Sequence, residues 1–177
     1  NDYDKEKYEA KVPSVESRIK TFKELSQRLG KKRVVWRYDP LILTKDIDVN
    51  ELLRRVENIG NQIYEFTEKL VFSFVDISIY KKVQSNLNKE NVPYIEWTEE
   101  LMEEFASKLC NINKSWGLHL GTCSEKIDLD KYGIVHNKCI DDDLMIDLFS
   151  EDKELMDFLG VEITPADLFS DGEVIKT

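Results

Sequence analysis

The sequence predicts an α/β protein in which helices alternate with parallel strands. Three short apolar runs, at 33–38, 70–76 and 118–123, have the composition of strands buried on both faces. Each run follows a segment with apolar residues at helical spacing, and this alternation is typical of β/α units in a parallel sheet. Each unit takes about 35–45 residues, close to the unit length of a barrel of ~250 residues. Because three strands cannot close a barrel, we expect either a small open α/β layer or part of a larger TIM-like (β/α) barrel.

Composition and charge exclude several classes of protein. The chain has 177 residues, which is enough for one domain with a real core. No apolar run approaches the ~20 residues that span a bilayer, so no membrane segment is expected. The net charge of −10 argues against nucleic-acid binding, which needs clustered Lys and Arg. Three cysteines, an odd number, indicate free thiols or metal ligands in a reducing compartment, and we expect a cytoplasmic protein.

The first third of the chain predicts an exposed arm followed by two helices. Residues 1–12 are charged and aperiodic, so we interpret them as the arm. Ser14 is a suitable N-cap for a helix that ends at Gly30. Asp48 begins the second helix with a sequence that resembles a capping box. Gly60, inside this helix, is a mild weakness worth roughly 1 kcal/mol relative to Ala.

The rest of the chain predicts one more unit and a tail. Residues 86–94 are polar and indicate a loop, and Thr98 is the expected cap of a third helix that ends near Gly117. A turn at 128–133 and an acidic helix at 141–149 follow. We therefore predict a partial barrel domain at 13–150 and a C-terminal tail at 151–177.

Acidic and basic residues stand where the predicted strands end. In the first strand, Val35, Arg37 and Asp39 share one face because side chains alternate, and Pro40 argues against continuing it as a central strand. The second strand ends on Asp76. Ligands of parallel α/β sheets bind at the carboxyl ends of the strands. The alternative is a structural Arg37–Asp39 ion pair, with Asp76 capping a turn.

A possible metal site involves three residues near the third strand. Cys123 ends this strand, and His136 and Cys139 are close enough in sequence for one turn to direct both toward one point. Thiolate and imidazole are ligands that zinc or iron prefers, with a fourth ligand from Glu125, Asp128 or a cysteine outside this chain. The alternative is that the cysteines fill packing positions and His136 lies on the surface.

Four motifs together resemble one bacterial family. They are WRYDPLIL (36–43), FSFVDI (72–77), LGTCSEKIDLDKYGI (120–134) and HNKCID (136–141). This combination resembles the family called domain of unknown function 1848, which is regarded as related to radical S-adenosylmethionine enzymes and to spore photoproduct lyase. The resemblance implies a barrel with an iron–sulfur cluster and S-adenosylmethionine in the intact protein. The family's N-terminal half and its C-terminal CxxxCxxC motif are not found in this chain, so we expect the chain alone to hold neither cofactor.

The resemblance also implies a role for the strand ends. Five residues would point toward a shared mouth: Arg37, Asp39, Asp76, Cys123 and Glu125. Of these, Arg37, Asp39, Asp76 and Glu125 would bind the substrate. A missing barrel segment or a second chain would then cover the inner surface, on which we expect Val35, Phe72 or Phe74, and Leu120. Two alternatives remain: a domain that holds a metal without catalysis, and a protein-interaction domain.

Overall fold

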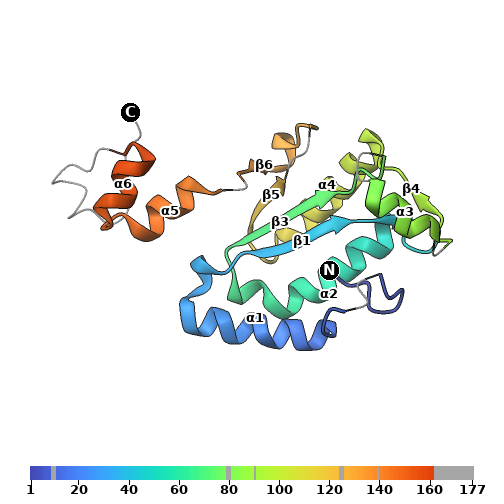
Figure 1. Ribbon diagram of the computed structural model, residues 1–177, viewed down its shortest axis with the longest axis horizontal. Coiled ribbons are helices and arrows are strands. Elements are labelled where there is room, and N and C mark those ends of the chain that lie inside the picture. The colour runs from blue at the N-terminus through green and yellow to red at the C-terminus, as the bar shows by residue number, and fades with distance from the viewer. Residues whose placement is uncertain (9–10, 79–80, 90, 124–125, 139, 162–177) are drawn as a thin grey trace. The chain divides into compact units, whose positions relative to one another are not determined.

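The chain forms two compact units, residues 1–137 and 138–177, in a computed structural model (Figure 1). The structure describes residues 1–8, 11–78, 81–89, 91–123, 126–138 and 140–161. The division falls between residues 137 and 138, whereas we predicted a domain at 13–150 and a tail at 151–177.

The first unit is built on a four-stranded parallel sheet, as the sequence predicts for an α/β protein. The strand order is β1-β3-β5-β6, and every neighbouring pair is parallel. The strands are β1 (Trp36–Leu41), β3 (Lys69–Phe74), β5 (His119–Cys123) and β6 (Ile134–Asn137). Strands that follow chain order in this way are arranged as in a (β/α) barrel, although the four described strands do not close. The strand β6 was not predicted, because four residues without an apolar run carry little signal.

Three long helices cover one face of this sheet. They are α1 (Val15–Leu29), α2 (Val49–Ile63) and α4 (Glu99–Asn113). Each begins at the predicted cap: Ser14, Asp48 and Thr98 accept a hydrogen bond from a backbone N–H three residues on. Helix α2 packs against both α1 and α4. Figure 1 shows α1 and α2 side by side along the sheet.

The smaller elements correct one prediction. A helix, α3 (Lys81–Lys89), occupies part of the region 86–94 that we expected to be a loop. It precedes β4 (Tyr94–Ile95), which pairs antiparallel with β2 (Leu43–Thr44). Short 3-10 helices are η1 (Lys31–Arg33), η2 (Tyr64–Phe66) and η3 (Asp130–Tyr132).

The N-terminal segment is not the exposed arm that we predicted. Tyr3 is 1% exposed, and its hydroxyl donates to the carbonyl of Pro40 and accepts from the N–H of Ile42, both at 3.0 Å. The buried guanidinium of Arg55 on α2 makes a two-point contact with the Glu6 carboxylate, at 2.7 and 2.9 Å. One aromatic ring and one acid thus fasten a segment whose average composition resembles that of a surface arm.

The first strand is displaced relative to its prediction. Residues 31–33 form η1, and β1 runs through Pro40 to Leu41, with a cis peptide bond between Asp39 and Pro40 and a shift of register before Leu41. The strand β1 is an outer strand of the described sheet. Proline is tolerated there because its missing N–H removes no hydrogen bond from the middle of a sheet.

Within the described residues of the first unit, the helices α1, α2 and α4 cover one face of the sheet. On that face lie Trp36, Tyr38, Phe72, Phe74 and Leu120, all buried. Phe72 and Phe74 meet the ring of Phe105 on α4, with centroids 5.6 and 5.8 Å apart. The expectation that strand 33–38 is buried on both faces is therefore wrong. We also expected another segment to cover Phe72, Phe74 and Leu120, but these residues are buried beneath helices of this chain.

The second unit contains two short helices in its described part. They are α5 (Asp142–Phe149), which confirms the predicted acidic helix, and α6 (Lys153–Leu159). Asp141 and Asp152 cap them, and Ile146 and Met156 are buried. None of the helices in the described ranges is long and apolar enough to cross a membrane.

Candidate functional site

The face of the sheet opposite the helices, which we call the open face, carries a linked set of polar side chains. A guanidinium nitrogen of Arg37, Nη2, lies 2.7 Å from a carboxylate oxygen of Asp39, Oδ2. The other Asp39 oxygen accepts a hydrogen bond from the hydroxyl of Ser73 on β3. Cys123 on β5 is near enough to Arg37 to contribute, after Asp39, to the raised pKa of the guanidinium. These four residues, the open-face cluster, thus join three neighbouring strands. Arg37 is the second residue of β1, and Asp39, Ser73 and Cys123 lie closer to the carboxyl ends.

The parallel register explains why these residues meet. Arg37 pairs with Val71, and Val71 pairs with Gly121, so the three positions share the open face. Side chains two residues further along each strand return to this face, which brings Asp39 and Cys123 to it. The cluster therefore follows from strand alternation and from register together.

Charge pairing stabilises the cationic form of Arg37. The hydrogen bond from Arg37 to Asp39, followed by the nearby thiol of Cys123, raises the pKa of the Arg37 guanidinium above its ordinary value. The side chains of Arg37 and Asp39 remain 44% and 31% exposed. An ion pair this exposed contributes about 0–1 kcal/mol to folding, so stability gives little reason for its presence.

The arrangement suits recognition of an anionic group. A guanidinium has five N–H donors in a planar fork, and this fork matches carboxylate and phosphate oxygens. Asp39 uses one of these donors in the ion pair, and Asp39 and Ser73 fix the position of the guanidinium. The hydroxyl of Ser73 and the thiol of Cys123 stand beside it as further polar groups.

Asp76 and Glu125 were also predicted for the site. Asp76 is exposed, and its carboxylate accepts a hydrogen bond from the Ser78 hydroxyl at 2.6 Å. This contact agrees with the alternative in which Asp76 stabilises a turn. Glu125 lies outside the described residues.

The three predicted metal ligands do not share one face of the sheet. Cys123 is in register with Asn137, and Thr122 with His136, so the side chains of Cys123 and His136 start from opposite faces. His136 is exposed, and Cys139 lies outside the described residues. The zinc site therefore stays a prediction.

Within the described ranges, one other group has the geometry to hold a metal ion. It consists of Asp141, Asp142 and Asp143, at the start of α5. Lys138 already pairs with two of these carboxylates, at 2.5 and 3.2 Å. The group is therefore explained by helix capping and charge pairing.

Sequence reasoning missed Ser73 and the role of Gly121. Ser73 stands between two phenylalanines in an apolar run, so it reads as an incidental polar residue, although period-two alternation places it opposite to them. A Cβ on Gly121 would lie 3.3 Å from the Cβ of Asn137, so only a very small residue keeps this face flat. Within the sequence, the alternation of side-chain directions over residues 72–74 was the one signal that could have identified Ser73.

The cysteines of the described residues do not fit an iron–sulfur cluster. Such clusters need three or four converging thiolates. Cys110 lies on α4, which packs on the helix-covered face, whereas Cys123 lies near Arg37 on the open face. The sheet separates these two thiols.

An open parallel sheet with helices on one face and ionised side chains on the other defines an α/β protein built of consecutive β/α units. The family model described as Domain of unknown function (DUF1848) matches residues 1–161, and the chain belongs to this family. No curated protein and no solved structure matches the chain.

Proposed function

We propose that the chain is the wall of a (β/α) barrel in a radical-SAM-like iron–sulfur protein, where it supplies substrate-binding residues at the strand ends. The strand order supports this proposal, because parallel neighbours that follow chain order, with helices on one face only, form the repeating part of such barrels. The open face then corresponds to the inner surface of the barrel. A further barrel segment or a second chain completes it.

The open-face cluster is the observation that carries the proposal. Arg37, Asp39, Ser73 and Cys123 come from three strands, and the guanidinium of Arg37 pairs with Asp39 toward the carboxyl ends, where barrel enzymes bind their substrates. A substrate with a carboxylate or another anionic group fits the guanidinium of Arg37. Asp39 and Ser73 act as positioning residues for this guanidinium.

The iron–sulfur cluster belongs to residues outside this chain in our proposal, since Cys110 and Cys123 do not converge. The test compares the 177-residue chain with the intact natural protein, both purified without oxygen. We expect about four iron atoms and matching sulfide per intact protein, and none in the 177-residue chain. An intact protein without iron contradicts the radical-SAM-like part of the proposal.

Binding at the open face needs a separate test. We expect citrate or inorganic phosphate to shift the backbone amide resonance of Gly121, and Arg37→Gln to abolish this shift. Lys20→Gln, which removes an exposed lysine from α1, is the matched control and leaves the shift unchanged. If neither anion shifts Gly121, or if Arg37→Gln behaves as the control, the cluster is not an anion site.

A protein-interaction domain is the second candidate. The observation that favours it is the outer strand β6, where the apolar side chain of Val135 is 52% exposed on the open face. An exposed outer strand is a template for pairing with another chain. Light scattering at increasing protein concentration tests this candidate, and Val135→Lys should reduce any self-association.

A further inference from the structure

We infer that the N-terminal segment, residues 1–8, positions the open-face cluster, and that Tyr3 is the positioning residue within it. The hydroxyl of Tyr3 holds the backbone next to Asp39, and the Asp39 carboxylate in turn holds the guanidinium of Arg37. The inference rests on the proposed function, because it concerns the anion site at the same cluster. It makes the start of the chain a part of that site.

The backbone around Asp39 departs from the regular ladder between β1 and β3. The register shifts between Tyr38 and Leu41. There, Asp39 and Pro40 of β1 stand opposite a single residue of β3, Ser73. Such an irregularity bends a strand, redirects a side chain and leaves backbone groups without partners in the ladder. The direction of the Asp39 side chain therefore depends on whatever else holds this stretch of backbone.

The N-terminal segment supplies partners for this backbone. The side-chain amide of Asn1 donates to the carbonyl of Asp39 at 2.9 Å. The hydroxyl of Tyr3 donates to the carbonyl of Pro40 and accepts from the N–H of Ile42, both at 3.0 Å. These contacts fix three consecutive peptide groups directly after the Cα atom of Asp39. The carboxylate of Asp39 is thereby held in one direction.

The fixed carboxylate then determines how well Arg37 binds an anion. One oxygen of Asp39 lies 2.7 Å from Nη2 of Arg37, and the other accepts a hydrogen bond from the hydroxyl of Ser73. A free arginine side chain has many rotamers, and binding an anion removes this freedom. A guanidinium that is already held loses less freedom on binding, so its affinity is higher.

Two arginines of the helix layer fasten the segment. Arg55 of α2 makes its two-point contact with the carboxylate of Glu6. Arg18 of α1 donates to the backbone carbonyl of Asn1 at 2.9 Å and to the carboxylate of Asp4 at 2.8 Å. The segment thus connects helices α1 and α2 to the carboxyl end of β1, and the contacts of Tyr3 are the last link before Asp39.

The variant Tyr3→Phe tests the inference without any ligand. It keeps the ring, which packs against the rings of Tyr8 and Tyr38 at 5.9 and 6.4 Å, and it removes both hydrogen bonds of the hydroxyl. Relaxation of the Arg37 side-chain Nε reports the order of the guanidinium. We expect this order to fall in Tyr3→Phe.

Tyr94→Phe is the matched control. It removes a tyrosine hydroxyl that accepts a hydrogen bond from Gln84 at 3.1 Å, on the strand β4, which is not part of the parallel sheet. The order of the Arg37 guanidinium should stay as in the native chain. Asn1→Ala, which removes the contact with the carbonyl of Asp39, should lower this order less than Tyr3→Phe does, because only one hydrogen bond is lost.

Citrate binding provides a second readout through the amide resonance of Gly121. Tyr3→Phe should weaken binding by about threefold to tenfold, the cost of ordering one long side chain, and Tyr94→Phe should leave it unchanged. Coupling between two sites is reciprocal. Citrate should therefore slow hydrogen exchange of the Ile42 amide, which donates to Tyr3, in the native chain but not in Arg37→Gln.

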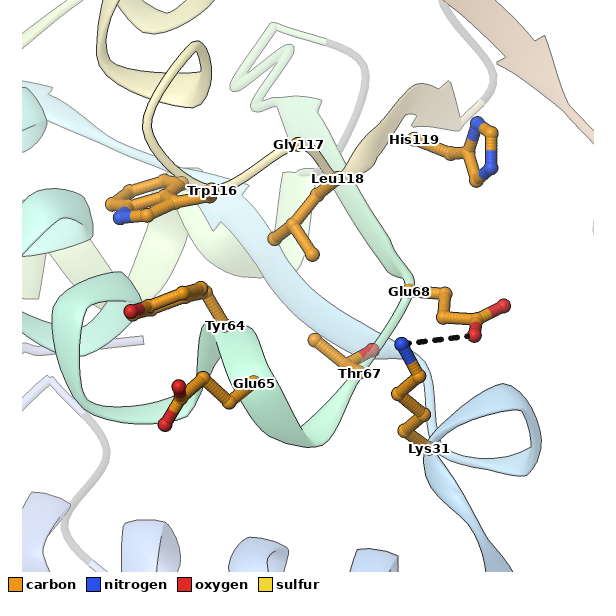
Figure 2. Close-up of a pocket in the computed structure, with 9 residues that line it drawn as sticks. All are labelled: Lys31, Tyr64, Glu65, Thr67, Glu68, Trp116, Gly117, Leu118 and His119. Atoms are coloured by element: carbon orange, nitrogen blue, oxygen red, sulfur yellow. Dashed lines mark ion pairs between the residues drawn. The ribbon is translucent and has the colours of Figure 1, made fainter.

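The pocket at the amino ends of β3 and β5 provides the negative control for citrate. Figure 2 shows the Lys31–Glu68 ion pair in this pocket. Together with Glu65, the lining carries two carboxylates and one lysine, which gives no preference for an anion. The backbone amide of Leu118, which also lines the pocket, should therefore not shift when citrate shifts that of Gly121.

Two results would overturn the inference. One is an Arg37 guanidinium that is as ordered in Tyr3→Phe as in the native chain. The other is an equal loss of order in Tyr94→Phe, which would indicate a general loss of rigidity. If citrate does not bind the native chain, the proposed anion site fails, and the order of Arg37 still decides whether Tyr3 positions it. If citrate binds the native chain and Tyr3→Phe equally well, the anion site stands and the positioning role of Tyr3 is wrong.

Discussion

The two faces of the parallel sheet are built from the same strands and yet differ in almost every property. On the covered face, Trp36 and Tyr38 of β1 are 4% and 0% exposed and pack under the helices, whereas Arg37, between them, keeps 44% of its side chain exposed. On β3, Phe72 is buried against Phe105 while its neighbour Ser73 donates to Asp39. The covered face therefore contributes most of the packing free energy. On the open face Val71 is buried as well, while the side chains of Arg37 and Asp39 remain accessible for binding.

The largest expected effect comes from the covered face. Phe72→Ala should lower the free energy of unfolding by about 3–5 kcal/mol, because it leaves a cavity among aromatic rings. Ser73→Ala, one residue along the same strand, should cost only about 0.5–1.5 kcal/mol. Urea denaturation measures both. Similar losses in the two variants would show that the faces are not distinct in energy.

The next effect concerns the packing between α2 and the segment after α4. A Cβ on Gly60 would lie 2.3 Å from the indole ring of Trp116, so Gly60→Ala forces the ring to move. We expect a loss of about 1–3 kcal/mol from overpacking, which exceeds the gain in helix propensity of about 1 kcal/mol. Asn58→Ala, on the exposed side of the same helix, has the propensity gain alone and should stabilise slightly. A more stable Gly60→Ala variant would mean that the close approach is absent.

The contribution of Glu51 and its ion pairs on α2 to folding stability should depend on pH. Hydrogen bonds from Arg54, and then from Arg55, lower the pKa of Glu51 to about 2 from an ordinary value of 4.5. Since the folded-state pKa is lowered, the stabilisation is complete above about pH 4.5 and is lost as the pH falls toward 2. Glu51→Gln should therefore show a smaller loss of stability than the native chain between pH 5 and pH 3, by urea denaturation at each pH.

A matched control separates Glu51 from the other acids. Glu57→Gln removes an exposed glutamate from the same helix and should keep the pH dependence of the native chain. If both variants have the same slope, the Glu51 contacts with Arg54 and Arg55 do not contribute to acid stability.

The smallest effect on folding is expected on the open face. Replacing Arg37 and Asp39 together by leucine should change the free energy of unfolding by less than about 1 kcal/mol, because the pair is exposed. The same double variant should lose all binding of citrate or phosphate at this face. Unchanged binding together with unchanged stability would remove both residues from the site.

Local signals in the sequence were sufficient for the helices and for the direction of the strands. Ser14, Asp48 and Thr98 cap their helices as predicted, because capping depends on residues only three positions apart. Helix–strand alternation was enough to predict parallel neighbours, since a crossover helix returns the chain to the same edge of the sheet. Alternation also placed Arg37 and Asp39 on one face of β1, where they form the ion pair that was the alternative to a ligand site.

Contacts between distant segments were decided only by the tertiary structure. Tyr3 is buried against residues nearly forty positions away. Its hydroxyl donates to the carbonyl of Pro40 and accepts from the N–H of Ile42. Helix propensity alone suggests that Gly60 destabilises α2. The packing of Trp116 nevertheless requires glycine there, because a Cβ would overlap the indole ring. The partnership of Ser73 with Asp39, and the separation of Cys123 from His136, depend on the register between strands. Register is set by how whole faces pack, so it leaves no mark in any one segment of the sequence.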